Sequence, residues 1–471
     1  MSMLTLREAA ALIPGATVLG DDTTTFDRIS TDSRTTGPGD LFVAIKGERF
    51  DAHDFLAQVA ERRTSAALVS RSPADWRLPA LRVADTRIAL QELARGWRAR
   101  FGIPVVAVTG SNGKTTVKGM IASIFAAAVG EDARLATTGN LNNDIGVPLT
   151  LLRLHAEHRL AVIELGMNHP GETEVLARMT QPTIALINNA QREHQEFMAT
   201  VEAVALEHAS VIHALPDGAH AVFPADDAYA GIWRVAATDR QIVDFALDHD
   251  TAAVRGSRND DGSLHVITPS GAFDVMLNVI GDHNLRNALA ATAAGYSAGV
   301  SLDAIRRGLE TFEPVTGRLQ RKHAKLAPLA DVAVIDDTYN ANPDSMRAAI
   351  DVLAAQPGFR ALVIGDMGEV GDHAKAFHHE IGEYARDRGI QALYALGEES
   401  QESVRAFGAH GQHFGSVDEL MAALAAGWTS LQDSAAGPGR GTILVKGSRF
   451  MRMERVVRAL TLEGAPDTGA H

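Results

Sequence analysis

The chain of 471 residues contains no cysteine. This absence excludes disulfide bonds, thiolate zinc ligands and a thiol nucleophile together, so chemistry must come from other side chains. Basic charge is also scarce, because 44 Lys and Arg stand against 58 Asp and Glu, a formal net charge of −14. Neutralising a nucleic-acid backbone takes clustered Lys and Arg, and we therefore expect no nucleic-acid partner. Small anions can still bind in local basic pockets.

Long apolar runs are missing as well. No stretch approaches the roughly 20 apolar residues of a membrane span. The first residues, MSMLTLREAAALIPGA, lack the apolar core, basic flank and cleavage site of a signal peptide. We therefore expect a cytoplasmic protein without a membrane span. The sequence is silent on oligomeric state, for which a monomer is the default expectation.

Short apolar runs alternate with Ala-rich helical patterns, which is typical of a parallel sheet covered by helices. The clearest runs lie at 103–110, 160–166, 183–189, 332–337, 360–366, 391–397 and 442–447. Between 216 and 280 the helical pattern fades, which predicts an antiparallel sheet or added strands. At roughly 150 residues per domain we expect about three α/β domains. Their expected limits are 1–99, 100–314 and 315–471.

The stretch VTGSNGKTT (108–116) resembles a nucleotide-binding loop of unusual spacing. The usual P-loop has a glycine five positions before the glycine of Gly-Lys-Thr, where this chain has Val108; its nearest glycine is Gly110. A strand, a glycine turn and a helix start together present N–H groups and a positive dipole end to an anion. Lys114 adds a charge for phosphates, and Thr115 a hydroxyl for Mg²⁺. A plain βα turn is disfavoured because all three elements agree, and a GTPase because no Asn-Lys-x-Asp motif occurs.

The shortened loop is similar to the Thr-Gly-x-x-Gly-Lys-Thr-Thr loop of the Mur ligase superfamily. These are ATP-dependent amide-forming enzymes of peptidoglycan assembly, with folylpolyglutamate synthases as relatives. Further matching stretches lie at 30–55, 137–152, 163–172, 281–291, 335–350, 363–371 and 444–454. The last three resemble the branch that adds D-Ala-D-Ala to UDP-MurNAc-tripeptide, the last cytoplasmic step of peptidoglycan precursor synthesis.

The resemblance implies a fold, a reaction and cofactors. The fold is the three-domain Mur ligase architecture: a UDP-sugar-binding N-terminal domain, a central P-loop-type parallel sheet that binds ATP, and a Rossmann-like C-terminal α/β domain. ATP phosphorylates the terminal carboxylate of UDP-MurNAc-tripeptide, and the amine of D-Ala-D-Ala attacks the acyl phosphate. Mg²⁺ and fixed cations neutralise the developing charge. The implied ATP contacts are Gly110, Ser111, Asn112, Gly113, Lys114, Thr115, Thr116, Asn284, Asn287, Arg318 and Asp337.

Three residues are expected to be catalytic: Lys114, Glu164 and His194. Thr115, Glu164 and His194 are the expected metal ligands. Glu164 ends a buried strand, where a carboxylate can hold metal, although a helix-capping role is the alternative. His194 belongs to a His-x-Glu pattern of the family, but with 18 histidines in the chain it could equally be a surface residue. Asn284 and Asn287 lie three apart, so both amides can reach one ligand, with an ordinary N-cap as the alternative.

Substrate contacts follow from the same resemblance. Asp32, Ser33 and Arg34 are expected to contact UDP, since a guanidinium suits a diphosphate. The other expected substrate contacts are Asn140, Asn143, Glu196, Tyr339, Asn340, Asn342, Lys446 and Arg449. Only Asp337 of the pair at 336–337 is assigned to the cleft, because adjacent strand residues point to opposite faces. His373, His378 and His379 are expected on a solvated helix face.

The chain departs from its family at His208. Many Mur ligases carry a carbamylated lysine there that helps bind a second Mg²⁺, and no lysine occurs here between Lys118 and Lys322. Imidazole is a poor Mg²⁺ ligand, and the spacing of neighbouring apolar residues turns His208 inward. A satisfied core histidine is one interpretation. The other is that His194, substrate and waters hold the second metal, or that it binds weakly, without bicarbonate.

Two further function classes stay open. A folylpolyglutamate synthase would also be an ATP-dependent ligase, but the segment at 30–55 would then have no UDP to bind. A non-enzymatic P-loop module would act through partner binding and leave Glu164, His194 and Glu196 idle. Amine-dependent phosphate release separates these classes.

Overall fold

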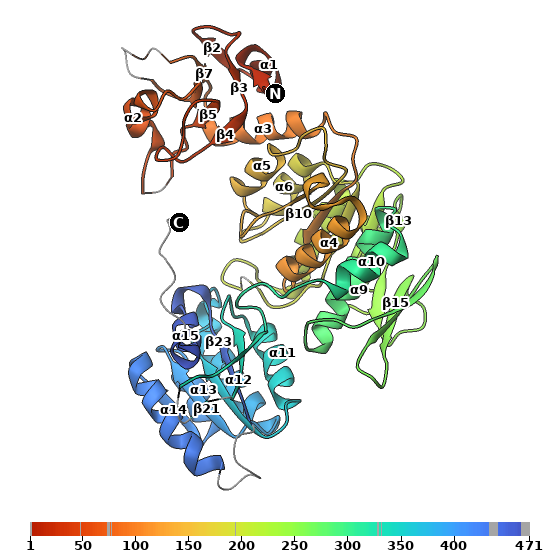
Figure 1. The fold of residues 1–471 in the computed structure, drawn as a ribbon, viewed down its shortest axis with the longest axis vertical. Helices are drawn as coiled ribbons and strands as arrows, with labels where there is room; N and C mark the ends of the chain where they lie inside the picture. Colours follow the sequence, from red (N-terminus) through yellow and green to blue (C-terminus); the bar gives the residue numbers. More distant parts are fainter. Residues whose placement is uncertain are drawn as a thin grey trace.

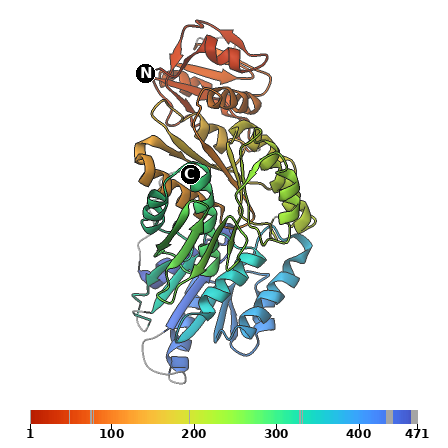
Figure 2. The same ribbon diagram turned by 90° about the vertical axis from the view of Figure 1, so that its right-hand side faces the viewer.

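The computed structural model describes residues 2–47, 49–72, 76, 78–193, 195–326, 329–330, 332–432 and 441–462, with the backbone alone for 429–432. Three α/β domains follow one another along the molecule. The N-terminal domain lies at one end, the C-terminal domain at the other, and the central domain between them (Figures 1 and 2).

The N-terminal domain is a small sheet with helices. Its elements are β1 (Leu4–Thr5), α1 (Leu6–Leu12), β2 (Thr17–Leu19), β3 (Thr25–Phe26), β4 (Arg28–Ser30), β5 (Asp40–Val43), α2 (Leu56–Glu61), β6 (Ala66–Val69), β7 (Ala80–Arg82) and α3 (Thr86–Arg98). Five strands have the order β2-β7-β6-β5-β4, and β1 pairs with β3. Strands β5 and β6 overlap the short apolar runs LFVAIKG (41–47) and AALVS (66–70).

A six-stranded sheet forms the centre of the second domain. Its strands are β8 (Val105–Thr109), β9 (Arg134–Ala136), β10 (Leu160–Glu164), β11 (Ile184–Ile187), β12 (His220–Val222) and β13 (Gln241–Ile242). All neighbours in the order β13-β12-β11-β8-β10-β9 are parallel. Its helices are α4 (Lys114–Val129), α5 (Gly146–Leu151), α6 (Glu172–Thr180), α7 (Val201–His213), α8 (Ala230–Ala236), α9 (Asp282–Ser297) and α10 (Leu302–Glu310).

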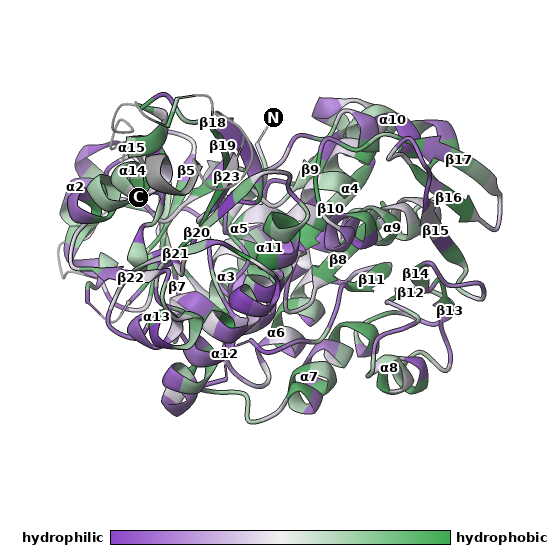
Figure 3. Ribbon diagram, turned by 90° about the horizontal axis from the view of Figure 1, so that it is seen from below, coloured by the Kyte–Doolittle hydropathy of each residue, from purple (hydrophilic) through white to green (hydrophobic). Residues whose placement is uncertain are grey.

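Burial on both faces explains why β8 is apolar throughout. Val105 and Ala107 belong to one hydrophobic cluster, and Val106 and Val108 belong to another, as the alternation of side chains along a strand requires. The strands of this sheet are predominantly hydrophobic in Figure 3. A charged side chain near the carboxyl end of β8 must therefore lie beyond the strand, in the loop that follows it.

The region between 216 and 280 contains both of the expected outcomes. Strands β12 and β13 extend the central parallel sheet. A separate sheet contains β14 (Phe245–Leu247), β15 (Val254–Arg258), β16 (Leu264–Thr268) and β17 (Gly271–Val275). Its pairs are antiparallel apart from β14 with β15.

The C-terminal domain contains a second six-stranded sheet. Its strands are β18 (Gln320–His323), β19 (Ala333–Asp337), β20 (Phe359–Ile364), β21 (Ala392–Leu396), β22 (Gly411–Phe414) and β23 (Gly441–Lys446). The order is β18-β19-β23-β20-β21-β22, with β18 alone antiparallel. The helices are α11 (Pro343–Ala354), α12 (Ala374–Asp387), α13 (Gln401–Phe407), α14 (Val417–Gln432) and α15 (Glu454–Thr461). The expected three-domain α/β architecture is confirmed.

One expectation about the surface of this domain is wrong. His373 and His379 are exposed, but His378 in α12 is fully buried. Its Nε2 accepts the N–H of Met367 at 3.1 Å, and its Nδ1 lies 2.8 Å from the carbonyl oxygen of Ala374. The ring ties the loop after β20 to α12, which spacing alone could not show. Among the described helices, none has the length and apolar character needed to cross a bilayer.

Candidate active site

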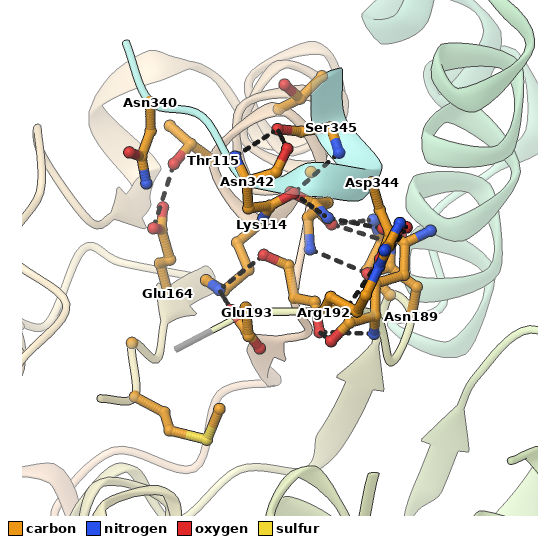
Figure 4. Close-up of a pocket in the computed structure, with 18 of the residues that line it drawn as sticks. Lys114, Thr115, Glu164, Asn189, Arg192, Glu193, Asn340, Asn342, Asp344 and Ser345 are labelled. Carbon is orange, nitrogen blue, oxygen red and sulfur yellow. Dashed lines mark hydrogen bonds and ion pairs between the residues drawn. The ribbon is translucent and has the colours of Figure 1, made fainter. Parts of the chain in front are cut away.

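A cavity of about 1100 Å³ lies between the central and C-terminal domains. Residues that follow the carboxyl ends of β8, β10, β11 and β19 line it, together with the first turns of α9 and α11. Figure 4 shows several of these side chains, among them Lys114, Glu164 and Asn342. Open α/β sheets bind their ligands at this edge of the sheet.

The loop between β8 and α4 depends on two glycines. Gly110 has φ +132°, and Gly113, immediately before α4, has φ +81°. A Cβ on Gly113 would come within 2.6 Å of the amides of Asn188 and Asn287. Only glycine, which has no side chain, therefore fits at this position. The N-terminus of α4 consequently faces the cavity with its N–H groups, as an anion site requires.

Lys114 reaches back over the loop. Its Nζ donates to the carbonyl oxygens of Gly110 and, at 3.3 Å, of Ser111. The same Nζ lies 3.3 Å from Oε2 of Glu193, a residue that is 5% exposed. The ammonium group is thus held directly at the mouth of the anion site.

Glu164 is the best-placed metal ligand among the described residues. Its carboxylate is buried at the end of β10, and Oε1 accepts the hydroxyl of Thr115 at 3.1 Å and the amide of Asn142 at 2.8 Å. Oε2 is buried without a hydrogen bond, and Nζ of Lys118 lies 3.9 Å from it. Burial lowers the pKa of Lys118. A buried carboxylate oxygen without a hydrogen-bond donor is suited to bind a cation.

The donor set suits a hard cation with several non-protein ligands. No group of three His, Asp or Glu side chains in the described part of the chain could hold a metal by itself. Mg²⁺ commonly takes one or two protein oxygens and completes its shell with phosphate and water. Thr115 and Glu164 meet that requirement.

Three buried asparagine side chains pack against the loop between β8 and α4. Asn188 donates from Nδ2 to Oδ1 of Asn287 at 2.9 Å, and Asn287 donates to Oδ1 of Asn284 at 3.0 Å. Asn284 and Asn287 thus lie together in the cavity wall, in the first turns of α9. Burial also lowers the pKa of the neighbouring His283. The cavity wall here presents the amide groups of three asparagines.

The C-terminal domain adds cations to the same cavity. Arg318 donates from Nη2 to the hydroxyl of Thr115 at 2.9 Å and lies 4.1 Å from the ring centre of Tyr339. Lys446, the last residue of β23, donates from Nζ to Oδ2 of Asp337 at 2.6 Å. Asp336 points away and bonds Thr338 at 2.7 Å. Arg318 thus links the two domains at the phosphate loop.

Arg192 forms a second link between these domains. Its guanidinium donates to Asp344 at 2.6 and 3.0 Å and to Glu380 at 2.7 and 3.0 Å. The hydrogen bonds that Arg192 donates to Glu380, followed by those that it donates to Asp344, raise its pKa, and the ring centre of Phe377 lies 5.4 Å away. One side chain from the loop after β11 therefore forms ion pairs with both α11 and α12.

We expect Arg192→Ala to loosen the C-terminal domain, because two carboxylates then lose their shared partner. Small-angle scattering should give a larger radius of gyration than for the unchanged chain, and kcat/KM for ligation should fall about tenfold through misplacement of the two cavity walls. Arg178→Ala, which removes an exposed arginine paired with Glu174, is the control. Identical scattering profiles for both variants and the unchanged chain would contradict this role.

The structure brings most of the expected site residues together. The cavity is lined by Ser111, Asn112, Gly113, Lys114, Thr115, Thr116, Asn143, Glu164, Asn284, Asn287, Arg318, Asp337, Tyr339, Asn340, Asn342 and Lys446. Gly110 lies beneath Lys114, and Asp32, Ser33 and Arg34 lie in the N-terminal domain after β4. Asn140, Glu196 and Arg449 are exposed and outside the cavity lining. His194 lies outside the described residues.

Several lining residues were not foreseen. They are Asn142, Asn188, Asn189, Gln191, Arg192, Glu193 and Asp344. Five of them follow β11, and Asn142 contacts Glu164 at the end of β10. The rule that ligands bind at the carboxyl ends of strands was therefore the available signal. Asn142 rather than Asn140 reaches Glu164, and residue spacing alone does not decide between them.

Comparison with known proteins gives two family matches. Residues 108–295 match the Mur ligase middle domain, and residues 317–449 match the family described as Mur ligase, glutamate ligase domain. The two matches contain the cavity walls from the central and C-terminal domains.

Whole-chain relatives agree with these matches. UDP-N-acetylmuramoyl-tripeptide–D-alanyl-D-alanine ligase of Escherichia coli is 42% identical over 98% of this chain and 100% of its own length. A crystal structure of MurF from Acinetobacter baumannii superposes with a TM-score of 0.88 at 35% identity, covering 98% of this chain and 99% of that one. MurF ligase from Thermotoga maritima, solved in complex with ADP, gives a TM-score of 0.80 at 26% identity and covers 93% and 97%.

Proposed function

The chain belongs to the Mur ligase family, and on that basis we propose that it is an ATP-dependent amide ligase which joins D-Ala-D-Ala to UDP-MurNAc-tripeptide. The observation that carries the proposal is a single cavity in which the phosphate loop, the buried Glu164 carboxylate and cations from the C-terminal domain face one another. Such a cavity can bring a polyphosphate and a carboxylate together.

The reaction has two steps. An oxygen of the tripeptide's terminal carboxylate attacks the γ-phosphorus of ATP, and ADP leaves. The amine of D-Ala-D-Ala then attacks the carbonyl carbon of the acyl phosphate, loses a proton and expels inorganic phosphate. The loop N–H groups and Lys114 hold the phosphates, and Arg318 offsets charge from the opposite wall. Asn284 and Asn287 contact the nucleotide base, and Asp337 its ribose.

Mg²⁺ fits this site, with Thr115 and Glu164 as its protein ligands. When bound, the ion lowers the cost of bringing phosphate and carboxylate charge together. The buried, unbonded Oε2 of Glu164 supports this assignment. His194 stays a proposed further ligand outside the described residues.

The amino substrate is placed against the C-terminal wall. Lys446 is held by Asp337 and, at 2.8 Å, by the carbonyl oxygen of Asn340, so its ammonium is fixed where it can pair with the dipeptide carboxylate. Arg449 is paired with Glu454 at 3.4 Å and would have to turn into the cavity to assist. Tyr339, Asn340 and Asn342 complete this wall, and Asn140, Asn143 and Glu196 are proposed contacts of the acyl substrate.

The UDP end of the substrate is assigned to Asp32, Ser33 and Arg34. Arg34 donates to Asp32 at 2.9 and 2.8 Å while its side chain stays 61% exposed. Hydrogen bonds from Arg34 lower the pKa of Asp32. The guanidinium is therefore oriented by its neighbour yet open to a diphosphate.

Arg34→Ala is expected to raise KM for UDP-MurNAc-tripeptide about tenfold and to change KM for ATP little, because a remote anchor contributes mainly uniform binding. Steady-state kinetics with each substrate varied in turn give the two constants. Arg7→Ala, which also removes an exposed arginine paired with an aspartate in the N-terminal domain, serves as the control. Equal increases in both KM values for Arg34→Ala would remove the UDP assignment.

The same proposal includes domain limits at 1–99, 100–314 and 315–471, a monomeric state and a cytoplasmic location. The first limit falls between α3 and β8 and the second between α10 and β18, where connecting segments could act as hinges.

The assay for this function measures phosphate release with ATP, Mg²⁺ and UDP-MurNAc-tripeptide while the amine is varied. D-Ala-D-Ala should be preferred over single amino acids. Release with folate and glutamate instead would favour a folylpolyglutamate synthase. No amine-dependent release with any substrate would favour a non-enzymatic P-loop module.

A further inference from the structure

Asp226 and Arg286 form an ion pair in the wall of the cavity between the central and C-terminal domains. Nη1 of Arg286 donates to Oδ1 of Asp226 at 2.8 Å, and Nη2 donates to Oδ2 at 2.7 Å. Two parallel hydrogen bonds between a guanidinium and a carboxylate fix the orientation of both groups. Arg286 is therefore held as an oriented, flat group in the cavity wall.

The ion pair lies on the β12 side of the phosphate loop. Asp226 follows β12, and the sheet order β12-β11-β8-β10 puts this strand on the side of β8 that is opposite to β10 and Glu164. Asn287, a proposed contact of the base, is bonded to Asn188 after β11, the strand between β8 and β12. A nucleotide with its terminal phosphate beside Glu164 therefore extends its base toward Arg286, the residue before Asn287 in α9.

The guanidinium of Arg286 suits the flat face of an aromatic base. Stacking uses the face of the guanidinium and leaves its hydrogen bonds to Asp226 intact. The side chain of Arg286 is 41% exposed, so a ring has room to contact it. The hydrogen bonds that Arg286 donates to Asp226 raise its pKa, so the group keeps its positive charge. Pro224, two residues before Asp226, adds apolar surface to the cavity lining.

We propose that Arg286, held in place by Asp226, stacks on the purine ring of the bound nucleotide and contributes to its affinity through the base alone. The inference rests on the proposed function, because it needs a nucleotide in this cavity. Asp226 is a positioning residue and does not touch the nucleotide. Asn284 and Asn287 contact the edge of the ring, and Arg286 covers one face.

Binding of two ligands, with and without a base, tests this assignment independently of turnover. The ligands are adenosine 5′-(β,γ-imido)triphosphate and ribose 5-triphosphate, each measured by calorimetry with Mg²⁺. We expect Arg286→Ala to weaken binding of the adenosine ligand about tenfold and to leave binding of ribose 5-triphosphate unchanged. Arg258→Ala, which removes an exposed arginine paired with Asp282 in the same domain, is the matched control and should change neither affinity.

Two further variants separate stacking from charge. Arg286→Lys keeps the positive charge but has no flat guanidinium, so it should lose most of the affinity that Arg286→Ala loses. Asp226→Asn keeps Arg286 but removes its charged partner, and it should weaken binding of the adenosine ligand about threefold without changing that of ribose 5-triphosphate. These variants also cover the case in which Arg286→Ala fails to fold.

The outcomes separate the inference from the proposed function. Unchanged affinity for the adenosine ligand in Arg286→Ala, an equal loss for both ligands, or full affinity in Arg286→Lys would overturn the inference and leave the ligase assignment standing. Failure of the unchanged chain to bind the adenosine ligand with Mg²⁺ would overturn the proposed function, and the inference with it.

Discussion

Lys114→Ala should lower kcat for ligation about a thousandfold, because a fixed cation aimed at developing phosphate charge is worth that order of rate. The Nζ of Lys114 contacts loop carbonyls and Glu193 rather than a hydrophobic core. Glu193 keeps its hydrogen bond to His208 when the lysine is removed. The fold should therefore survive, with a circular dichroism spectrum and a melting temperature close to those of the unchanged chain.

The comparison variant is Lys375→Ala, which removes an exposed lysine from α12. It should retain full activity, so a loss specific to Lys114 is not an effect of net charge. Near-normal turnover of Lys114→Ala would take the phosphate site away from this loop.

Glu164→Gln should lower kcat/KM by a factor of about one hundred or more, since the amide keeps the shape of the side chain but removes the charge that would hold Mg²⁺. The apparent Mg²⁺ affinity measured by titrating activity should fall in parallel. Stability should be nearly unchanged without ligands, because the buried Oε2 that is replaced has no hydrogen bond to lose.

Glu174→Gln provides the matched change at an exposed position of α6 and should behave as the unchanged chain does. If Glu164→Gln keeps both its turnover and its Mg²⁺ dependence, the carboxylate has another task, such as holding Thr115 and Asn142. A large loss of melting temperature would point the same way.

Local patterns were sufficient to predict the phosphate loop and the strands that lead to it. The apolar residues of β8 and the helical spacing after Lys114 are encoded in neighbouring positions, so both elements lie where the sequence places them. Adjacent Asp336 and Asp337 point to opposite faces, as strand geometry requires, and only Asp337 lines the cavity.

Contacts between distant segments could not be predicted in the same way. Arg192 is one basic residue in a polar loop until α11 and α12 bring Asp344 and Glu380 to it. Glu193 directly precedes the His-x-Glu pattern and has no pattern of its own that would predict a role. Its partner His208 comes from a later helix, and His208 in turn contacts Thr109 of another strand. Burial of His208 followed from its spacing, but its bonding required the folded chain.

Oxygen transfer tests the central claim, an acyl phosphate formed in this cavity, most directly. UDP-MurNAc-tripeptide labelled with ¹⁸O in its terminal carboxylate is incubated with ATP, Mg²⁺ and D-Ala-D-Ala, and the released phosphate is examined by mass spectrometry. If the carboxylate attacks ATP and the amine then expels phosphate, each phosphate released from doubly labelled substrate carries one ¹⁸O. Phosphate without label would mean that it came from attack by water, and the account would be contradicted.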